Sequence, residues 1–139
     1  TVKEIKTVRP GDKLSVGEIP VEVVPAYNLN KSFHPKQDGK VGYVVQLGKV
    51  RVYHTGDSDH VPEMAQVKAD VALLPVSGTY VMTAEEAAEA AKSLRPKVAI
   101  PMHYGTFPPL VGTPQALRGL TQDVAGLEIH DLKPGLTLG

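Results

Sequence analysis

The chain has 139 residues, of which 42% are hydrophobic and 22% charged, a composition that fits one globular domain and excludes a fibrous or low-complexity protein. Its 15 basic and 15 acidic residues give a net charge of zero, which argues against a dedicated binder of nucleic acid or anionic membranes. Cysteine is absent, which excludes disulfides, thiolate catalysis and cysteine-ligated zinc. With neither a signal-peptide nor a membrane-span pattern, the cytoplasm is the expected compartment.

The first part of the chain has the alternating apolar and polar pattern of β-strands. Strands are predicted over residues 14–16, 19–23, 41–47 and 50–54. Gly17-Glu18 joins the first two, and Gly48-Lys49 joins the last two, where glycine suits the first central position of a type II′ turn. Between these pairs lies a polar segment, residues 28–40, which is too long for a simple hairpin loop. Loops of this length inside compact domains are often functional.

The second part of the chain changes to a pattern of strands alternating with helices. The predicted elements are a short helix at 62–67, strands at 71–76, 98–102 and 127–130, helices at 84–94 and 114–124, and a turn at 133–135. Thr83 and Glu86 form a capping-box signature before a helix with alanines along one face, and Pro96 ends it. The two strands around this helix are almost continuously apolar, as in strands covered on both faces, and predict a parallel crossover. The fold class is therefore α/β.

Three of the predicted strands are followed by polar residues whose side chains can act in catalysis or bind a metal. His54 and Asp57 follow one strand, Thr79 and Tyr80 follow the next, and His103 follows the third. Because the carboxyl ends of neighbouring parallel strands meet at one edge of a sheet, these side chains are expected to converge. A carboxylate together with imidazoles is a suitable ligand set for a divalent metal.

Each of these pieces also has an ordinary structural explanation. Residues 56–58, Gly-Asp-Ser, are favoured in simple turns. A single histidine such as His103 is more often a hydrogen-bonded structural residue, and His34 could be a solvated loop residue. A nucleophile system could be assembled from Ser77, His103 and Asp57, but no Gly-x-Ser-x-Gly elbow supports it.

Taken in order, the motifs are more specific than their parts. They are residues 53–59 (YHTGDSD), 62–64 (PEM), 70–80 (DVALLPVSGTY) and 96–105 (PKVAIPMHYG). This series closely resembles the metallo-β-lactamase superfamily, in particular its branch of small prokaryotic metal-dependent hydrolases related to the ascorbate-phosphate lactonases. The likeness extends from about Val8 to Gly135.

The resemblance implies a fold, a cofactor and a reaction. The fold is a four-layer αβ/βα sandwich, and the cofactor is a divalent metal, zinc first, with manganese or nickel as alternatives. Asp57 matches the aspartate that bridges two metal ions, and His103 matches a ligand of the second metal. The implied function is hydrolysis of an ester, lactone, amide or phosphoester through a metal-bound hydroxide.

The sequence departs from the family pattern in its ligands. The principal cluster, His-x-His-x-Asp-His, is absent from these residues, so the chain is expected to be the carboxyl-terminal portion of the sandwich, a single partial domain over 1–139. Asn28 stands near the place of a further ligand histidine, and His34 could partly substitute for it. His54 is expected to support a ligand or contact substrate, and Thr79 and Tyr80 to lie on the rim of the cleft.

Two further expectations follow for partners and activity. A sheet that is apolar on both faces needs cover on both, so the chain is expected to form a homodimer or to associate with a missing amino-terminal segment. The substrate would be a small molecule. The alternative to a hydrolase is a non-catalytic half-fold that assembles as an oligomer without a functional metal centre.

Overall fold

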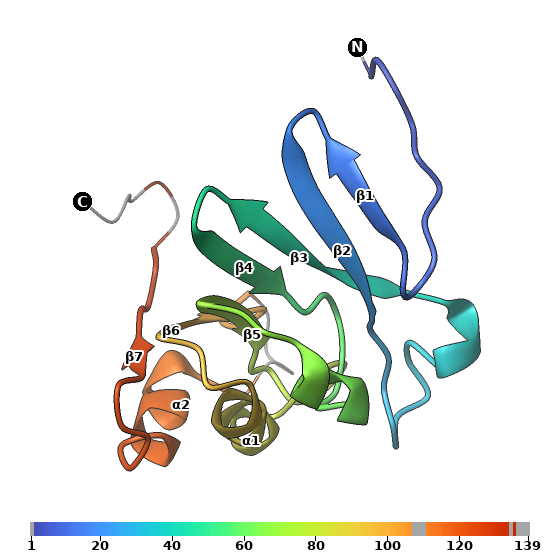
Figure 1. Ribbon diagram of the computed structural model, residues 1–139. Coiled ribbons are helices and arrows are strands. Elements are labelled where there is room, and N and C mark those ends of the chain that lie inside the picture. The colour runs from blue at the N-terminus through green and yellow to red at the C-terminus, as the bar shows by residue number, and fades with distance from the viewer. Residues whose placement is uncertain (1, 107–110, 134, 136–139) are drawn as a thin grey trace.

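The computed structural model describes residues 2–106, 111–133 and 135 (Figure 1). Its strands are β1 (Lys13–Val16), β2 (Ile19–Pro25), β3 (Val41–Leu47), β4 (Val50–His54), β5 (Val71–Pro75), β6 (Val98–Met102) and β7 (Glu128–Ile129). Its helices are α1 (Ala84–Leu94), α2 (Pro114–Leu120) and two short 3₁₀ helices, η1 (Lys36–Asp38) and η2 (Pro62–Gln66). In the described part of the chain, no helix has the length and apolarity that a membrane span requires.

All seven strands form one sheet in which the spatial order equals the chain order. Strands β1 to β4 are antiparallel neighbours, and β4 to β7 are parallel neighbours. The predicted α/β class and the parallel crossover through β5, α1 and β6 are therefore confirmed. Gly48, in the β3–β4 turn, has a φ of 60°, the positive value that the predicted glycine position requires.

The carboxyl-terminal elements are shorter than predicted. Helix α2 ends at Leu120 and not near Val124, and β7 covers only two residues. Thr121 explains the early end of the helix, because its hydroxyl donates to the carbonyl oxygen of Leu117 at 2.9 Å at the C-cap. The predicted closing turn includes residue 134, which lies outside the described residues.

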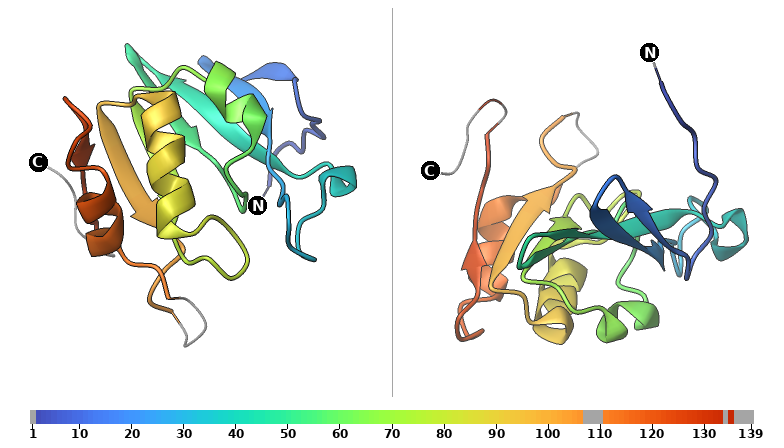
Figure 2. Two further views of the ribbon diagram at one scale, coloured as in Figure 1. Left: turned by 90° about the horizontal axis from the view of Figure 1, so that it is seen from below. Right: turned by 45° about the horizontal axis from the view of Figure 1, so that its top comes forward.

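One face of the sheet is covered by helices and carries the hydrophobic core. Figures 1 and 2 show α1, α2 and η2 on the same side of the strands. Helix α1 buries the predicted face, which consists of Ala84, Ala87, Ala88, Ala91 and Leu94, and it also buries Ala90. The capping box is present, because Thr83 Oγ1 accepts from the Glu86 amide at 3.1 Å and the Glu86 carboxylate accepts from the Thr83 amide at 2.7 Å.

The opposite face of the sheet, which we call the open face, is apolar but only partly buried. Strand pairing places Tyr43, Val52, Leu73 and Ile100 on this face, opposite in direction to the core residue Leu74. The exposed fraction of Tyr43 is 38%, whereas Leu74 is fully buried. No described helix lies over this face, so within the described chain β5 and β6 are covered by helices on one face, as expected (Figure 2).

Candidate metal centre

Four connections meet at one edge of the sheet. The loop 28–40 follows β2, and the segments after β4, β5 and β6 begin at the same edge, because these four strands run in one direction. This edge is therefore the place where the carboxyl ends of the parallel strands open, the usual position for a site in an α/β sheet.

The Asp57 carboxylate lies between two imidazole rings. Its Oδ2 is 3.7 Å from Nε2 of His34, and its Oδ1 is 3.8 Å from Nε2 of His103. These separations are too long for hydrogen bonds but close to the ~3.3 Å between two ligands of one tetrahedral zinc ion. The structure therefore brings three of the predicted site residues together: two from strand ends and one from the long loop.

In each imidazole ring, the nitrogen that points away from Asp57, Nδ1, has a hydrogen-bond partner. Nδ1 of His34 lies 3.3 Å from the carbonyl oxygen of Tyr80, which can only accept, so this nitrogen carries a proton, and in the neutral ring Nε2 presents a lone pair to Asp57. Nδ1 of His103 lies 3.0 Å from the hydroxyl of Ser77. Metal-binding histidines are commonly oriented in this way. A lone pair and a carboxylate that face each other are stabilised by a cation between them, so the donor set fits a divalent metal.

The backbone at both histidines has a conformation that residues other than glycine rarely adopt. His34 has a φ of 50° and His103 a φ of 58°, and they are two of three non-glycine residues with positive φ in the described chain. Gly56, which precedes Asp57, has a φ of 68°, and a Cβ there would lie 2.9 Å from the carbonyl oxygen of Val41. Such strain persists only where surrounding contacts enforce it, and it is concentrated at functional sites.

Asn28 lies beside this group and has one unused acceptor. Its side chain is buried, and its Nδ2 donates at 2.7 Å to the Tyr80 carbonyl oxygen that also contacts the ring of His34. Its Oδ1 is buried and has no partner among the described residues. The Tyr80 ring packs edge-on against Phe33 with centroids 4.7 Å apart, and Thr79 beside it is half-buried. Asn28 and His34 thus share the Tyr80 carbonyl oxygen as a hydrogen-bond partner.

His54 points to a different part of the surface. Its Nδ1 accepts from the Gly56 amide at 3.1 Å, so Nε2 carries the proton of the neutral ring. It pairs with Tyr43 on the open face, and no described contact joins it to Asp57. Among the described residues, no group of three or more His, Cys, Asp or Glu side chains is arranged so that it could hold a metal ion as it stands, and this includes Asp57, His34 and His103.

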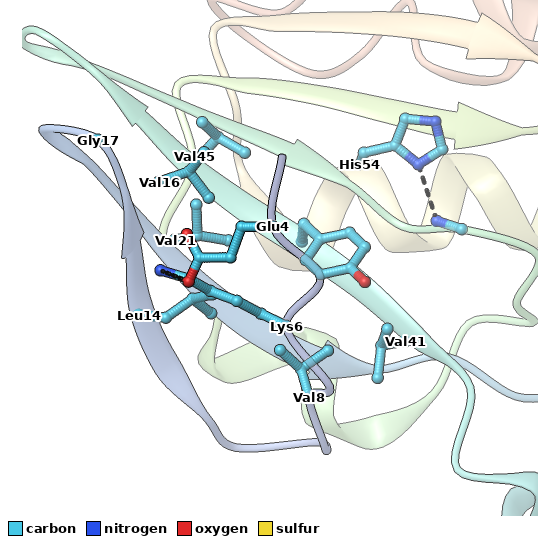
Figure 3. A pocket seen from close by; sticks show the side chains of 12 residues that line it. Glu4, Lys6, Val8, Leu14, Val16, Gly17, Val21, Val41, Val45 and His54 are labelled. Atoms are coloured by element: carbon cyan, nitrogen blue, oxygen red, sulfur yellow. Dashed lines mark hydrogen bonds and ion pairs between the residues drawn. The ribbon is translucent and has the colours of Figure 1, made fainter. Parts of the chain in front are cut away.

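An apolar groove lies on the open face and does not include Asp57. It has a volume of about 760 Å³, and Figure 3 shows valine and leucine side chains of β1 to β3 forming it. Glu4 and Lys6 of the amino-terminal segment lie across these strands, and His54 stands to one side. Gly56 and His54 are the only lining residues within three positions of Asp57, so this apolar groove borders the candidate metal centre without containing it.

Sequence reasoning missed the residues that fix the loop 28–40. Lys36 donates to Glu63 of η2 at 2.9 Å and lies 4.7 Å above the ring of Tyr27, whose hydroxyl also donates to Glu63 at 2.8 Å. The hydrogen bond from Lys36 lowers the pKa of Glu63. The only signal in the sequence was the unusual length of the loop, because no local pattern pairs residues this far apart.

Ser77 is placed as a support and not as a nucleophile. Its hydroxyl contacts His103, but the residue is fully buried, so it has no access to a substrate. Asp57 faces the same ring at 3.8 Å, beyond hydrogen-bond distance. The geometry does not support a Ser-His-Asp nucleophile system.

Comparison with known proteins decides the family. Residues 2–103 match the family described as the β-lactamase superfamily domain. The chain belongs to this superfamily. The resemblance seen in the motifs is thereby confirmed, and it is shared with proteins described as metal-dependent hydrolases of the UPF0173 family.

Several relatives show how much of the superfamily domain this chain represents. A UPF0173 metal-dependent hydrolase of Pyrococcus furiosus is 38% identical over 134 residues, covering 88% of this chain and 56% of the relative. A metallo hydrolase of Ignicoccus hospitalis is 28% identical with a TM-score of 0.79, covering 94% of this chain and 58% of that structure. A Thermotoga maritima protein, described as a candidate zinc-dependent hydrolase of the metallo-β-lactamase superfamily, is 32% identical with a TM-score of 0.63, covering 81% and 57%. The chain spans about half the length of these relatives.

Proposed function

We propose that this chain is part of a metal-dependent hydrolase and that Asp57, His34 and His103 bind a divalent cation, zinc in the first instance. The observation that carries the proposal is the Asp57 carboxylate, which presents one oxygen to the Nε2 atom of each histidine at 3.7 and 3.8 Å. Imidazole and carboxylate together suit zinc, and manganese or nickel would be accepted by the same donors. The names of the relatives support the same assignment.

The chain's own residues would orient the metal and the substrate. A bound divalent metal would lower the pKa of a water molecule and polarise the scissile group. Ser77 and the Tyr80 carbonyl hold the two rings so that Nε2 faces the metal position. The Asp57 carboxylate would supply the negative charge that holds the metal between the two rings. His54 carries an exposed Nε2–H at the edge of the apolar groove, where it could donate to a substrate oxygen.

The substrate class follows from the metal and is broad. An ester, lactone, amide or phosphoester each presents a polarised group that a metal-activated water can attack. The apolar groove beside the centre favours a substrate with an apolar portion.

Metal content is the direct test. The chain would be purified without added metal and then equilibrated with zinc, manganese or nickel. We expect bound metal close to one equivalent, and less than about a tenth of an equivalent with all three metals would contradict the proposal. Asp57→Ala, His34→Ala and His103→Ala should each weaken zinc binding. His60→Ala and His130→Ala are the matched controls, because these rings contact Ser93 and Glu128 instead. Equal losses in the controls would also contradict the assignment.

We also propose that the chain is the carboxyl-terminal portion of a four-layer sandwich and that its open face packs on polypeptide that the relatives carry outside the matched region. The support is the apolar open face together with the chain's coverage of 55% and 56% of two relatives. The ligand cluster His-x-His-x-Asp-His, absent from these 139 residues, would come from that polypeptide.

Light scattering tests this assembly. The chain alone, and the chain mixed with the unmatched portion of the Pyrococcus furiosus relative, would be measured at micromolar concentration. A one-to-one complex supports the proposal. A homodimer would assign the open face to a second copy, and a stable monomer of 14.9 kDa in both samples would contradict it.

The second candidate function is a non-catalytic half-fold that assembles without a functional metal centre. The absence of the principal ligand cluster from the sequence favours it. Its signature would be a stable oligomer that binds less than about a tenth of an equivalent of metal.

A further inference from the structure

The ring of His34 is carried by a loop that has little regular structure of its own. Between β2 and β3 the only regular structure is η1, three residues long. His34 itself has a φ of 50°, a conformation that must be enforced by neighbouring contacts. The contacts that enforce it therefore decide whether its Nε2 stays beside Asp57.

Besides the Lys36–Glu63 pair, a buried carboxylate two residues after Asp57 contacts the start of this loop. The Asp59 side chain is 2% exposed; its Oδ2 accepts from the Leu29 amide at 2.9 Å, and its Oδ1 forms an ion pair with Lys31. The amide of Asn28 in turn donates to the carbonyl oxygen of His34 at 2.9 Å, which closes the loop onto itself. The short segment 57–59 thus supplies the candidate ligand Asp57 and, through Asp59, fixes the loop that supplies His34.

The Asp59–Lys31 ion pair is also linked to helix α1, which follows the segment that contacts the ring of His34. Lys31 lies 3.6 Å from Glu86, whose carboxylate closes the capping box of α1 through the Thr83 amide. The connection between β5 and α1 carries the Tyr80 carbonyl that contacts Nδ1 of His34, and it is tied back to the segment 57–59 by the bond from the Met82 amide to the Ser58 carbonyl oxygen at 3.0 Å.

We infer that Asp59, with Lys31, is the positioning residue of the metal centre: it sets the place of His34 relative to Asp57 and thereby the affinity for metal. This inference rests on the proposed function for the role of His34, but the fixing of the loop by Asp59 can be measured without metal. A buried carboxylate paired with a lysine is costly to desolvate, so its presence here is explained better by a need for position than by stability alone.

The experiment uses Asp59→Asn, which keeps an oxygen for the Leu29 amide but removes the charge that binds Lys31. The control is Asp70→Asn, because Asp70 also accepts a backbone amide, that of Arg51 at 2.9 Å, and pairs with a lysine, but at the opposite end of the sheet. Lys31→Arg tests rescue, because it retains the charge pair.

The first measurement is amide hydrogen exchange in the metal-free chain. We expect the Asn28 and Leu29 amides to exchange at least about tenfold faster in Asp59→Asn, with no such local change in Asp70→Asn or Lys31→Arg. A change spread evenly over all amides would mean that Asp59 only stabilises the fold, and unchanged exchange at Asn28 and Leu29 would overturn the inference.

The second measurement is zinc affinity at a temperature at which every variant is folded. We expect Asp59→Asn to lose about 10- to 100-fold, the loss typical for residues that orient metal ligands, and Asp70→Asn and Lys31→Arg to remain close to wild type. Unchanged affinity in Asp59→Asn would overturn the positioning role. If the wild-type chain binds no zinc, the proposed function fails, whereas the exchange experiment still decides whether Asp59 fixes the loop.

Discussion

Leu73 and Leu74 are neighbours in β5, yet they belong to two different environments. Leu74 points to the helix-covered face and is fully buried against the core, whereas Leu73 points to the open face and is only half-buried. The same division repeats at Val71 and Ala72 and along β6, so a continuous apolar run gives one face that is already packed and one that is only partly buried. An apolar strand sequence therefore predicts that both faces of the strand must be shielded from water. It does not predict which helix or which other chain packs on each face.

The two leucines provide the sharpest test and the largest expected effect. Leu74→Ala removes fully buried methyl groups and leaves a cavity under α1, so it should lower the free energy of unfolding by about 2 to 5 kcal/mol. Leu73→Ala should cost distinctly less in the chain alone, because its side chain retains contact with solvent. Urea unfolding of both variants checks this. Equal losses would mean that the open face is as well covered as the other, for example by a second copy of the chain.

A second test concerns how closely α1 lies on the covered face. Ala88 is buried against the sheet, and Ala88→Leu should overpack this contact and cost about 1 to 3 kcal/mol of stability. Glu89→Leu, one residue away on the exposed side of the helix, is the control and should change stability by about 0.5 kcal/mol or less. An unchanged unfolding midpoint in Ala88→Leu would contradict the close packing of the alanine face.

The smallest effect is expected at the border of the covered face, where η2 anchors the loop 28–40. The hydrogen bond from Lys36 lowers the pKa of Glu63 from its usual value of 4.5, so the pair contributes stability above that pH and loses it as the pH falls through the lower folded-state value. Because the pair is partly exposed, Glu63→Gln should cost only about 1 kcal/mol or less at neutral pH.

The difference in unfolding midpoint between wild type and Glu63→Gln should therefore shrink as the pH is lowered from about 7 to about 3. Glu89→Gln serves as the comparison, since its pair with Lys92 lies on the exposed side of α1. A difference for Glu63→Gln that stays constant over this range would show that the loss does not come from the ion pair.

Much of the fold could be predicted from local patterns. The alternation in β1 to β4, the capping box at Thr83 and the alanine face of α1 each depend on residues within a few positions of one another, and each is present in the structure. The end of α2 was misplaced, because the hydroxyl of Thr121 competes for a backbone carbonyl, an interaction that hydrophobic periodicity does not show.

The candidate site likewise has some features that local patterns predict and others that they do not. Asp57 and His103 could be placed at one edge because strand direction determines where strands end. The sequence placed His34 among the residues around the cleft, but its position beside Asp57 depends on the contacts of the loop 28–40 with Asp59 and the Tyr80 carbonyl. The positive φ at both histidines likewise has no sequence signal.

The sequence by itself determined the α/β class, the parallel crossover around α1 and the chemical types available for a metal centre, because these follow from short-range patterning and from residue identity. Only the tertiary structure decided that all seven strands form one sheet in chain order, and that His34 lies beside Asp57 and His103 while His54 turns to the open face. The physical reason is that these contacts depend on which segments lie next to each other in space. Hydrophobic periodicity reports only local structure, so it does not indicate contacts between residues more than twenty positions apart.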